Sequence, residues 1–212
     1  MFALNKGVGN KRFAEDICNH RALIVKRKYE CIGFKMRNLY AVTTGTGDML
    51  ASAVQELPVS GWRDDVPDIT MYDRDRNPAL GLSHPFRWWL KRLEVWTTEG
   101  HLLGTLQQRF SLLTKSFDVE DAKGRVRMTV FGLHQFSLGT NFFFMKGDRQ
   151  IATFTGRVQG LLRSIYSEEV QHRVEYQDGP LTVEERQLIL VAALFIDRQY
   201  FDNRGIDRSG TD

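Results

Sequence analysis

The chain of 212 residues is long enough for one large domain with a substantial core. Its hydrophobic content of 42% and aromatic content of 11% exclude an intrinsically disordered protein. The net charge is only +3, so the overall composition does not indicate a nucleic-acid-binding protein.

Positive charge is concentrated at the N-terminus, where the first 40 residues contain nine Lys or Arg against three acidic residues. This excess favours contact with phosphate groups, although a solvated basic surface gives the same pattern. We assign residues 1–20 to a basic N-terminal segment. No apolar run there is long enough for a signal peptide, and Phe2 rather than glycine follows Met1, so N-myristoylation is not predicted. We expect a cytoplasmic protein.

The two cysteines, Cys18 and Cys31, provide neither a disulfide framework nor a metal-binding spacing. We expect both thiols to be buried or half-buried and reduced. The five histidines are scattered, with no pair spaced to share one helix face, so turn or surface positions are expected for them (His20, His84, His101, His134 and His172).

Five β-hairpins are predicted between residue 39 and about residue 155. Each combines an alternating apolar run, a turn containing Asp, Gly or Asn, and a second apolar run. From the second hairpin on, they start every 24 or 25 residues, at positions 69, 93, 117 and 142. Such a regular series indicates one antiparallel meander that closes into a barrel and so removes its edges.

A single helix follows the strands. Thr182 and Glu185 form the sequence signature of a capping box, and the nine residues Leu188–Ile196 are all apolar. A helix that is apolar on every side must be surrounded by protein, and nine residues are too few to cross a bilayer. We therefore predict a closed antiparallel β-barrel around a buried C-terminal helix at about 183–201, with a polar tail at 203–212.

Several segments, in order along the chain, resemble the phospholipid scramblase family and the wider Tubby-like, LURP-one-related barrel proteins. They extend over about residues 21–202, and the apolar helix with its Phe-Ile-Asp and Tyr-Phe ending is the most specific (Pro85–Arg87, Leu93–Trp96, Gly104–Gln108, Phe117–Gly124, Gly160–Arg163 and Leu188–Phe201). The resemblance implies a mainly β fold of about twelve strands around the central helix. It also implies a role in binding or moving membrane phospholipid.

Calcium dependence, described for some members of the family, is not expected here. The corresponding segment, Tyr166–His172, lacks the Asp-x-Asp order of the family's proposed Ca²⁺ site. Asp73–Asn77 begins like an EF-hand loop, but Pro78 and His84 stand where glycine and glutamate are required, so a turn stabilised by Asx hydrogen bonds is expected instead. We expect no metal and no other cofactor.

The candidate ligand-binding residues are basic and aromatic. The segment 85–92 mixes aromatic residues with cations, which suits a lipid headgroup interface, although one tryptophan could instead point into the barrel core. With the basic run after residue 25, the proposed anionic-headgroup site comprises Lys26, Arg27, Lys28, Arg87, Trp88, Trp89, Lys91 and Arg92.

These observations favour a non-enzymatic protein that binds acidic phospholipid or another anionic ligand, in peripheral contact with a membrane. No set of residues with the pattern of a catalytic site is found. The alternatives are a protein-interaction scaffold, a nucleic-acid-binding regulator and a true phospholipid scramblase. We expect anionic membrane lipids as partners, with a protein partner as an alternative and nucleic acid ranked below both.

Overall fold

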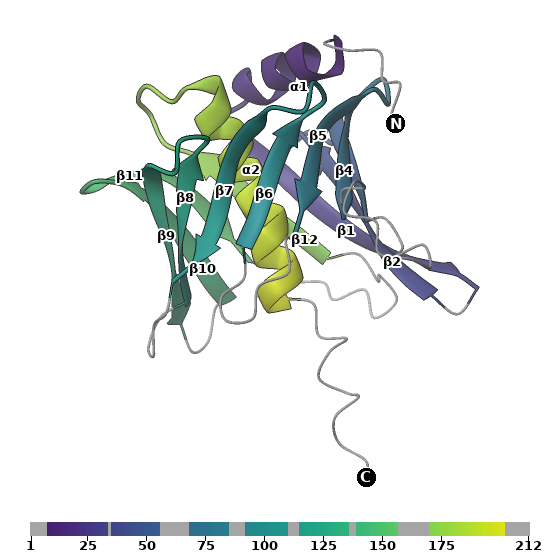
Figure 1. Ribbon diagram of the computed structural model, residues 1–212. Helices are drawn as coiled ribbons and strands as arrows, with labels where there is room; N and C mark the ends of the chain where they lie inside the picture. The colour runs from purple at the N-terminus through teal and green to yellow at the C-terminus, as the bar shows by residue number, and fades with distance from the viewer. Residues whose placement is uncertain are drawn as a thin grey trace.

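The computed structural model describes residues 8–33, 35–55, 68–84, 92–109, 115–135, 139–156 and 170–201. It contains one closed barrel of twelve strands (Figure 1). The strands are β1 (Ala22–Ile32), β2 (Lys35–Thr43), β3 (Met49–Gln55), β4 (Ile69–Asp73), β5 (Pro78–Ser83), β6 (Arg92–Thr97), β7 (Leu102–Gln108), β8 (Lys115–Asp121), β9 (Val126–Gln135), β10 (Gly139–Lys146), β11 (Arg149–Thr155) and β12 (Val170–Tyr176).

Each strand pairs antiparallel with its neighbours in the chain, and β1 pairs with β12 to close the barrel. All five predicted hairpins are present, as β2–β3, β4–β5, β6–β7, β8–β9 and β10–β11. Alternation decides which side chains enter the core: in β4, Ile69, Met71 and Asp73 are buried and the residues between them are only half-buried. The predicted fold class is confirmed.

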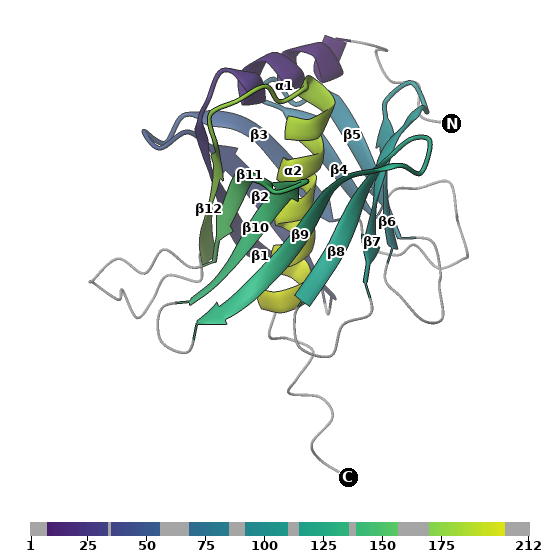
Figure 2. The same cartoon turned by 90° about the vertical axis from the view of Figure 1, so that its left-hand side faces the viewer.

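The helix α2 (Val183–Ile196) runs through the middle of the barrel, as Figure 2 shows. Thr182 begins it with the predicted capping box: its hydroxyl accepts a hydrogen bond from the Glu185 amide, and the Glu185 carboxylate accepts one from the Thr182 amide. Every residue from Gln187 to Ile196 is buried. A π-helical turn over Asp197–Phe201 continues the helix to Phe201.

Where α2 approaches the wall, the barrel uses glycine. A Cβ atom added at Gly104 of β7 would lie 2.4 Å from the Glu120 carbonyl oxygen and 3.0 Å from the Leu188 side chain. The close approach of the β8 backbone, together with Leu188 of α2, therefore requires a residue without a side chain at this position.

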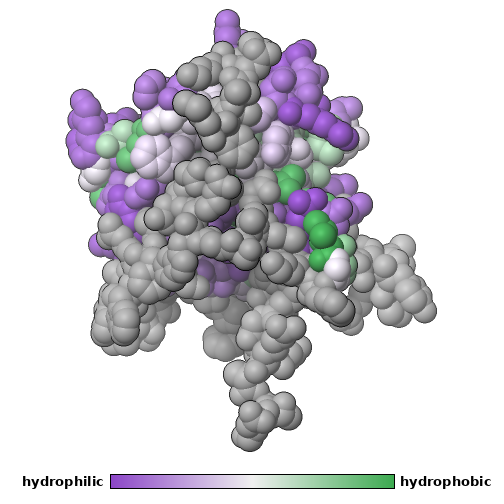
Figure 3. Space-filling view, turned by 45° about the vertical axis from the view of Figure 1, so that its right-hand side comes forward, coloured by the Kyte–Doolittle hydropathy of each residue, from purple (hydrophilic) through white to green (hydrophobic). Residues whose placement is uncertain are grey.

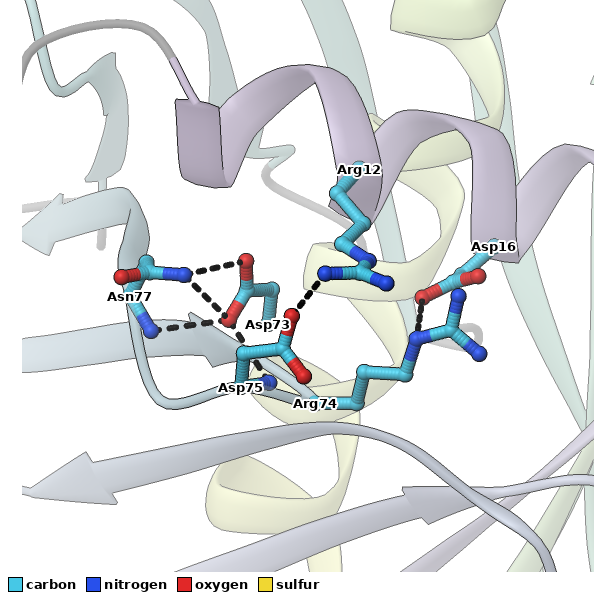
Figure 4. Close-up of polar contacts among 6 residues, drawn as sticks. All are labelled: Arg12, Asp16, Asp73, Arg74, Asp75 and Asn77. Atoms are coloured by element: carbon cyan, nitrogen blue, oxygen red, sulfur yellow. Dashed lines mark hydrogen bonds and ion pairs between the residues drawn. The ribbon is translucent and has the colours of Figure 1, made fainter.

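A second helix, α1 (Val8–Cys18), covers the end of the barrel at which α2 begins. It packs by Phe13 and Ile17, which are fully buried. Toward the turn between β4 and β5, Arg12 forms an ion pair with Asp75, and the buried Asp16 forms one with Arg74 (Figure 4). The pattern in residues 1–20 does not predict this helix, because its two apolar anchors stand among polar and charged residues and form no continuous apolar stripe.

Candidate functional site

The two ends of the barrel differ in how the strands are connected. The tight turns of the five hairpins lie at the end covered by α1. At the opposite end, which we call the distal end, β1 turns into β2, β5 ends, β6 begins, and α2 reaches its last residues (Figure 1). The ends of β5 and β6 that flank the predicted basic segment 87–92 are therefore at the distal end, and the segment 26–28 lies within β1, which runs toward that end.

The three consecutive basic residues of β1, Lys26, Arg27 and Lys28, do not all lie on the same face of the strand. Leu23, Val25 and Arg27 are fully buried, whereas Lys26 is half-buried and Lys28 is exposed. Because successive side chains of a strand point to opposite faces, Lys26 and Lys28 lie on the outside of the barrel and Arg27 on the inside. Only two of the three cations therefore lie on the outer surface.

Arg27 is instead paired within the barrel. Its guanidinium lies 3.0 Å from the carboxylate of Asp197 and donates a hydrogen bond of 3.0 Å to the carbonyl oxygen of Phe201. Both partners belong to the turn that ends α2. Arg27 is thus removed from the surface set predicted from the sequence, because the strand's alternation directs it toward the end of the central helix.

His172 and Tyr40 complete this buried polar cluster. His172 Nε2 contacts the second carboxylate oxygen of Asp197, and the imidazole lies between the rings of Phe154 and Phe201, with both centroid distances 4.9 Å. The expected surface position of His172 is wrong: the side chain is fully buried. Its place could be found from β12, where His172, Val174 and Tyr176 follow the inward alternation.

Tyr40 lies on β2 directly opposite Arg27. Burial, followed by the negative charge of Asp197, raises the pKa of the Tyr40 hydroxyl, so this group stays protonated. Each side chain of the cluster, Arg27, Tyr40, His172 and Asp197, is at most 2% exposed. The arrangement therefore serves to fix the end of α2 to β1, β2 and β12, and it is closed to a ligand in solvent.

A second polar contact lies beside the end of α2. The Asp68 carboxylate accepts hydrogen bonds from the amide and from Nδ1 of His84, at 2.6 and 2.8 Å, and the imidazole stacks on Phe195. Burial opposes ionisation of Asp68, but the hydrogen bonds and charge from His84 outweigh it and lower the pKa of this carboxyl. This pair joins the start of β4 to the end of β5.

Arg92, the last residue of the predicted set, is surrounded by its own partners. Its guanidinium lies 3.3 Å from Glu94 and 3.6 Å from Glu120, and it donates a hydrogen bond to the Thr105 hydroxyl. Its side chain is 20% exposed. The other predicted members of the segment, Arg87, Trp88, Trp89 and Lys91, lie outside the described residues.

The outer surface around Lys26 and Lys28 carries mixed charge. Arg37 on β2 pairs with Glu30 at 2.5 Å, and Arg173 on β12 pairs with Glu175 at 3.3 Å. Among the residues that Figure 3 colours by hydropathy, hydrophobic side chains form small areas between hydrophilic ones. Lys26 and Lys28 lie on this outer surface beside these ion pairs.

Comparison with models of known protein families shows the family to which the chain belongs. The family described as Scramblase matches residues 7–203, which include both helices and all twelve strands. The chain belongs to the scramblase family. Among solved structures, an X-ray structure of a protein from Arabidopsis thaliana matches with a TM-score of 0.47 and 13% identity, covering 82% of this chain and 90% of that one. No curated protein sequence matches the chain.

In this scramblase-family chain, no helix within the described ranges is long and apolar enough to cross a membrane. The described residues also contain no group of three or more His, Cys, Asp or Glu side chains arranged to hold a metal ion. The Asp73–Asn77 segment forms the expected Asx turn: Asp73 Oδ1 accepts hydrogen bonds of 2.9 and 2.8 Å from the amides of Asp75 and Asn77 (Figure 4).

Proposed function

We propose that this scramblase-family barrel binds the headgroups of anionic phospholipids, peripherally, through the outer face of β1. The observation that carries the proposal is the position of Lys26 and Lys28. They lie on one outward-facing row, near the distal end, while the cation between them neutralises Asp197 inside the barrel. Membership of the scramblase family supports a lipid as the ligand.

The chemistry of binding would be electrostatic. Two ammonium groups on adjacent outward positions of a strand are close enough to contact neighbouring phosphates, and each basic residue near an anionic membrane surface contributes about 1 kcal/mol. Such attraction weakens as salt increases, because the Debye length falls to about 8 Å at physiological ionic strength. A peripheral cytoplasmic protein with this surface would bind reversibly.

Co-sedimentation with vesicles tests the proposal. The protein should sediment with phosphatidylcholine vesicles that contain phosphatidylserine, more strongly as the anionic fraction rises and less strongly as salt is added. The double substitution Lys26→Ala/Lys28→Ala should weaken binding about tenfold or more. The control, Lys11→Ala/Lys123→Ala, removes the same charge from exposed positions at the α1 end and should bind like wild type. Absence of sedimentation at low salt would refute the proposal.

A further inference from the structure

The β1–β2 hairpin extends beyond the neighbouring wall of the barrel. Strand β12 pairs with β1 only from Ala22 to Arg27, whereas the pairing of β1 with β2 continues to Ile32. The five residues Lys28–Ile32 therefore continue past the last residue of β12 that pairs with β1. Figure 1 shows this end of the hairpin projecting from the barrel at the distal end.

The end of the hairpin exposes apolar side chains. Ile32 is 45% exposed and Cys31 is exposed, and Gly33 closes the turn with a φ of +60°. The expectation that both cysteines are at least half-buried is wrong for Cys31, because it lies beyond the part of β1 that the barrel covers. A single exposed apolar side chain is common on protein surfaces, so the position of Ile32, rather than its exposure alone, carries the argument.

Ile32 is distinguished by its location. Within the ranges that the structure describes, three other large hydrophobic side chains are exposed, Met49, Val126 and Val183, and all three begin elements at the α1 end. Ile32 alone among these four lies at the distal end. Behind it on the same strand, Lys28 and Lys26 follow on the outer face.

The outer row of β1 has Ile32 at its tip, then Glu30, whose carboxylate pairs with Arg37, and then Lys28 and Lys26. With the charge of Glu30 balanced by Arg37, an apolar tip followed by basic residues matches the layers of an anionic membrane surface. Apolar groups gain free energy by leaving water for the acyl boundary, and ammonium groups remain at the level of the phosphates. The spacing suits this arrangement: Ile32 is four residues beyond Lys28, about 13 Å along a strand.

We propose that the tip of the β1–β2 hairpin, Cys31 and Ile32, inserts into the interfacial layer of anionic membranes while Lys26 and Lys28 contact the headgroups. This inference rests on the proposed function and adds a defined depth and orientation: the distal end faces the membrane and α1 faces away from it. Insertion would give binding an apolar component that salt does not remove.

Cys31 supplies the probe for the test. An environment-sensitive fluorophore such as NBD, attached as a maleimide, will react with Cys31 first, because burial raises the pKa of the Cys18 thiol despite the nearby charge of Arg186. The Cys18→Ser variant confirms that the label is on Cys31. On vesicles containing phosphatidylserine the emission should shift to the blue and be quenched by lipids with a nitroxide near the headgroup.

Substitution of the tip provides a second readout. Ile32→Asp should weaken vesicle binding about tenfold, and Ile32→Leu should retain it. Val126→Asp is the matched control, because Val126 is 54% exposed at the α1 end and should not enter the membrane. Far-ultraviolet circular dichroism would verify that each variant is folded.

The outcomes separate the two proposals. Sedimentation with vesicles but no blue shift and no effect of Ile32→Asp would overturn insertion and leave headgroup binding intact. Absence of sedimentation would overturn headgroup binding, and insertion with it. A blue shift that is equal on pure phosphatidylcholine vesicles and unaffected by Lys26→Ala/Lys28→Ala would overturn the combined basic and apolar contact proposed here.

Discussion

The carboxylate of Asp197 lies 3.0 Å from the guanidinium of Arg27, and both side chains are fully buried inside the barrel. This pair joins the first strand of the fold to the turn that ends its last helix. Two buried charges are costly to desolvate, so each depends on the other and on the additional contacts from His172 and the Phe201 carbonyl. The pair thereby defines how far α2 enters the barrel.

Removal of one member should be more harmful than removal of both. Asp197→Ala leaves the Arg27 charge buried without its carboxylate and should lower the free energy of unfolding by about 3–5 kcal/mol. The double variant Arg27→Met/Asp197→Leu replaces the pair with apolar side chains and should lose less. Urea unfolding of the wild type, Asp197→Ala and the double variant provides the measurement. Equal losses in the single and double variants would contradict the assignment.

The barrel and its helix could be predicted because their signals are local. In the hairpin at Asp73–Asn77, for example, alternation and turn chemistry occur within a few consecutive residues. The helix is equally clear, since the run Leu188–Ile196 has no polar side. Such patterns need no knowledge of partners elsewhere in the chain.

The alternation of β12 indicates the inward position of His172, but the cluster as a whole could not be predicted, because its members are distant in sequence and polar. Ala22, Leu23, Ile24 and Val25 are all apolar, so the two-residue period of β1 is not visible before Lys26. Without that period, Arg27 cannot be separated from its basic neighbours. The basic segment itself is evident, but its division into an inner and an outer face depends on the strand.

The docking of α1 should depend on its apolar contacts more than on its ion pairs. Phe13 is fully buried, so Phe13→Ala should lower the free energy of unfolding by about 3–5 kcal/mol, as Phe-to-Ala substitutions in cores do. Arg12→Ala removes a contact with Asp75 in which both side chains are 45% exposed, so it should cost less than about 1 kcal/mol. Hydrogen exchange of the α1 amides reports the difference. If Arg12→Ala lost as much amide protection relative to the wild type as Phe13→Ala, the ion pair would hold α1 as strongly as the apolar contact does.

Gly104 should not accept a side chain. In Gly104→Ala, the added methyl group meets the Glu120 carbonyl oxygen and Leu188, which should destabilise the fold by about 1–3 kcal/mol. Gly45→Ala is the matched control, since a Cβ atom there has nothing within 4 Å. Thermal unfolding of both variants measures the effect. A Gly104→Ala variant as stable as Gly45→Ala would show that both the Glu120 backbone of β8 and Leu188 of α2 can move away from β7.

Glu185 should make stability depend on pH. Its carboxylate accepts a hydrogen bond from Lys146 at 2.5 Å and lies 3.5 Å from Arg127. Burial raises the pKa of Glu185, but the hydrogen bonds from Lys146 and the Thr182 amide, together with the two positive charges, outweigh burial and lower it overall. A carboxyl whose pKa is lower in the folded than in the unfolded chain stabilises the fold above the unfolded pKa, about 4.3.

The stability difference between the wild type and Glu185→Gln should therefore be constant near neutral pH and shrink as the pH falls below about 5, toward the lowered pKa of the folded state. Chemical unfolding measured from pH 7 to pH 3 checks this. Glu184→Gln, at an exposed position in the same helical turn, is the control and should leave the pH profile of the wild type unchanged. A Glu185→Gln profile parallel to that of the wild type would mean that Lys146 and Arg127 do not stabilise the ionised carboxylate, and the start of α2 would then be held by the Thr182 cap and apolar packing alone.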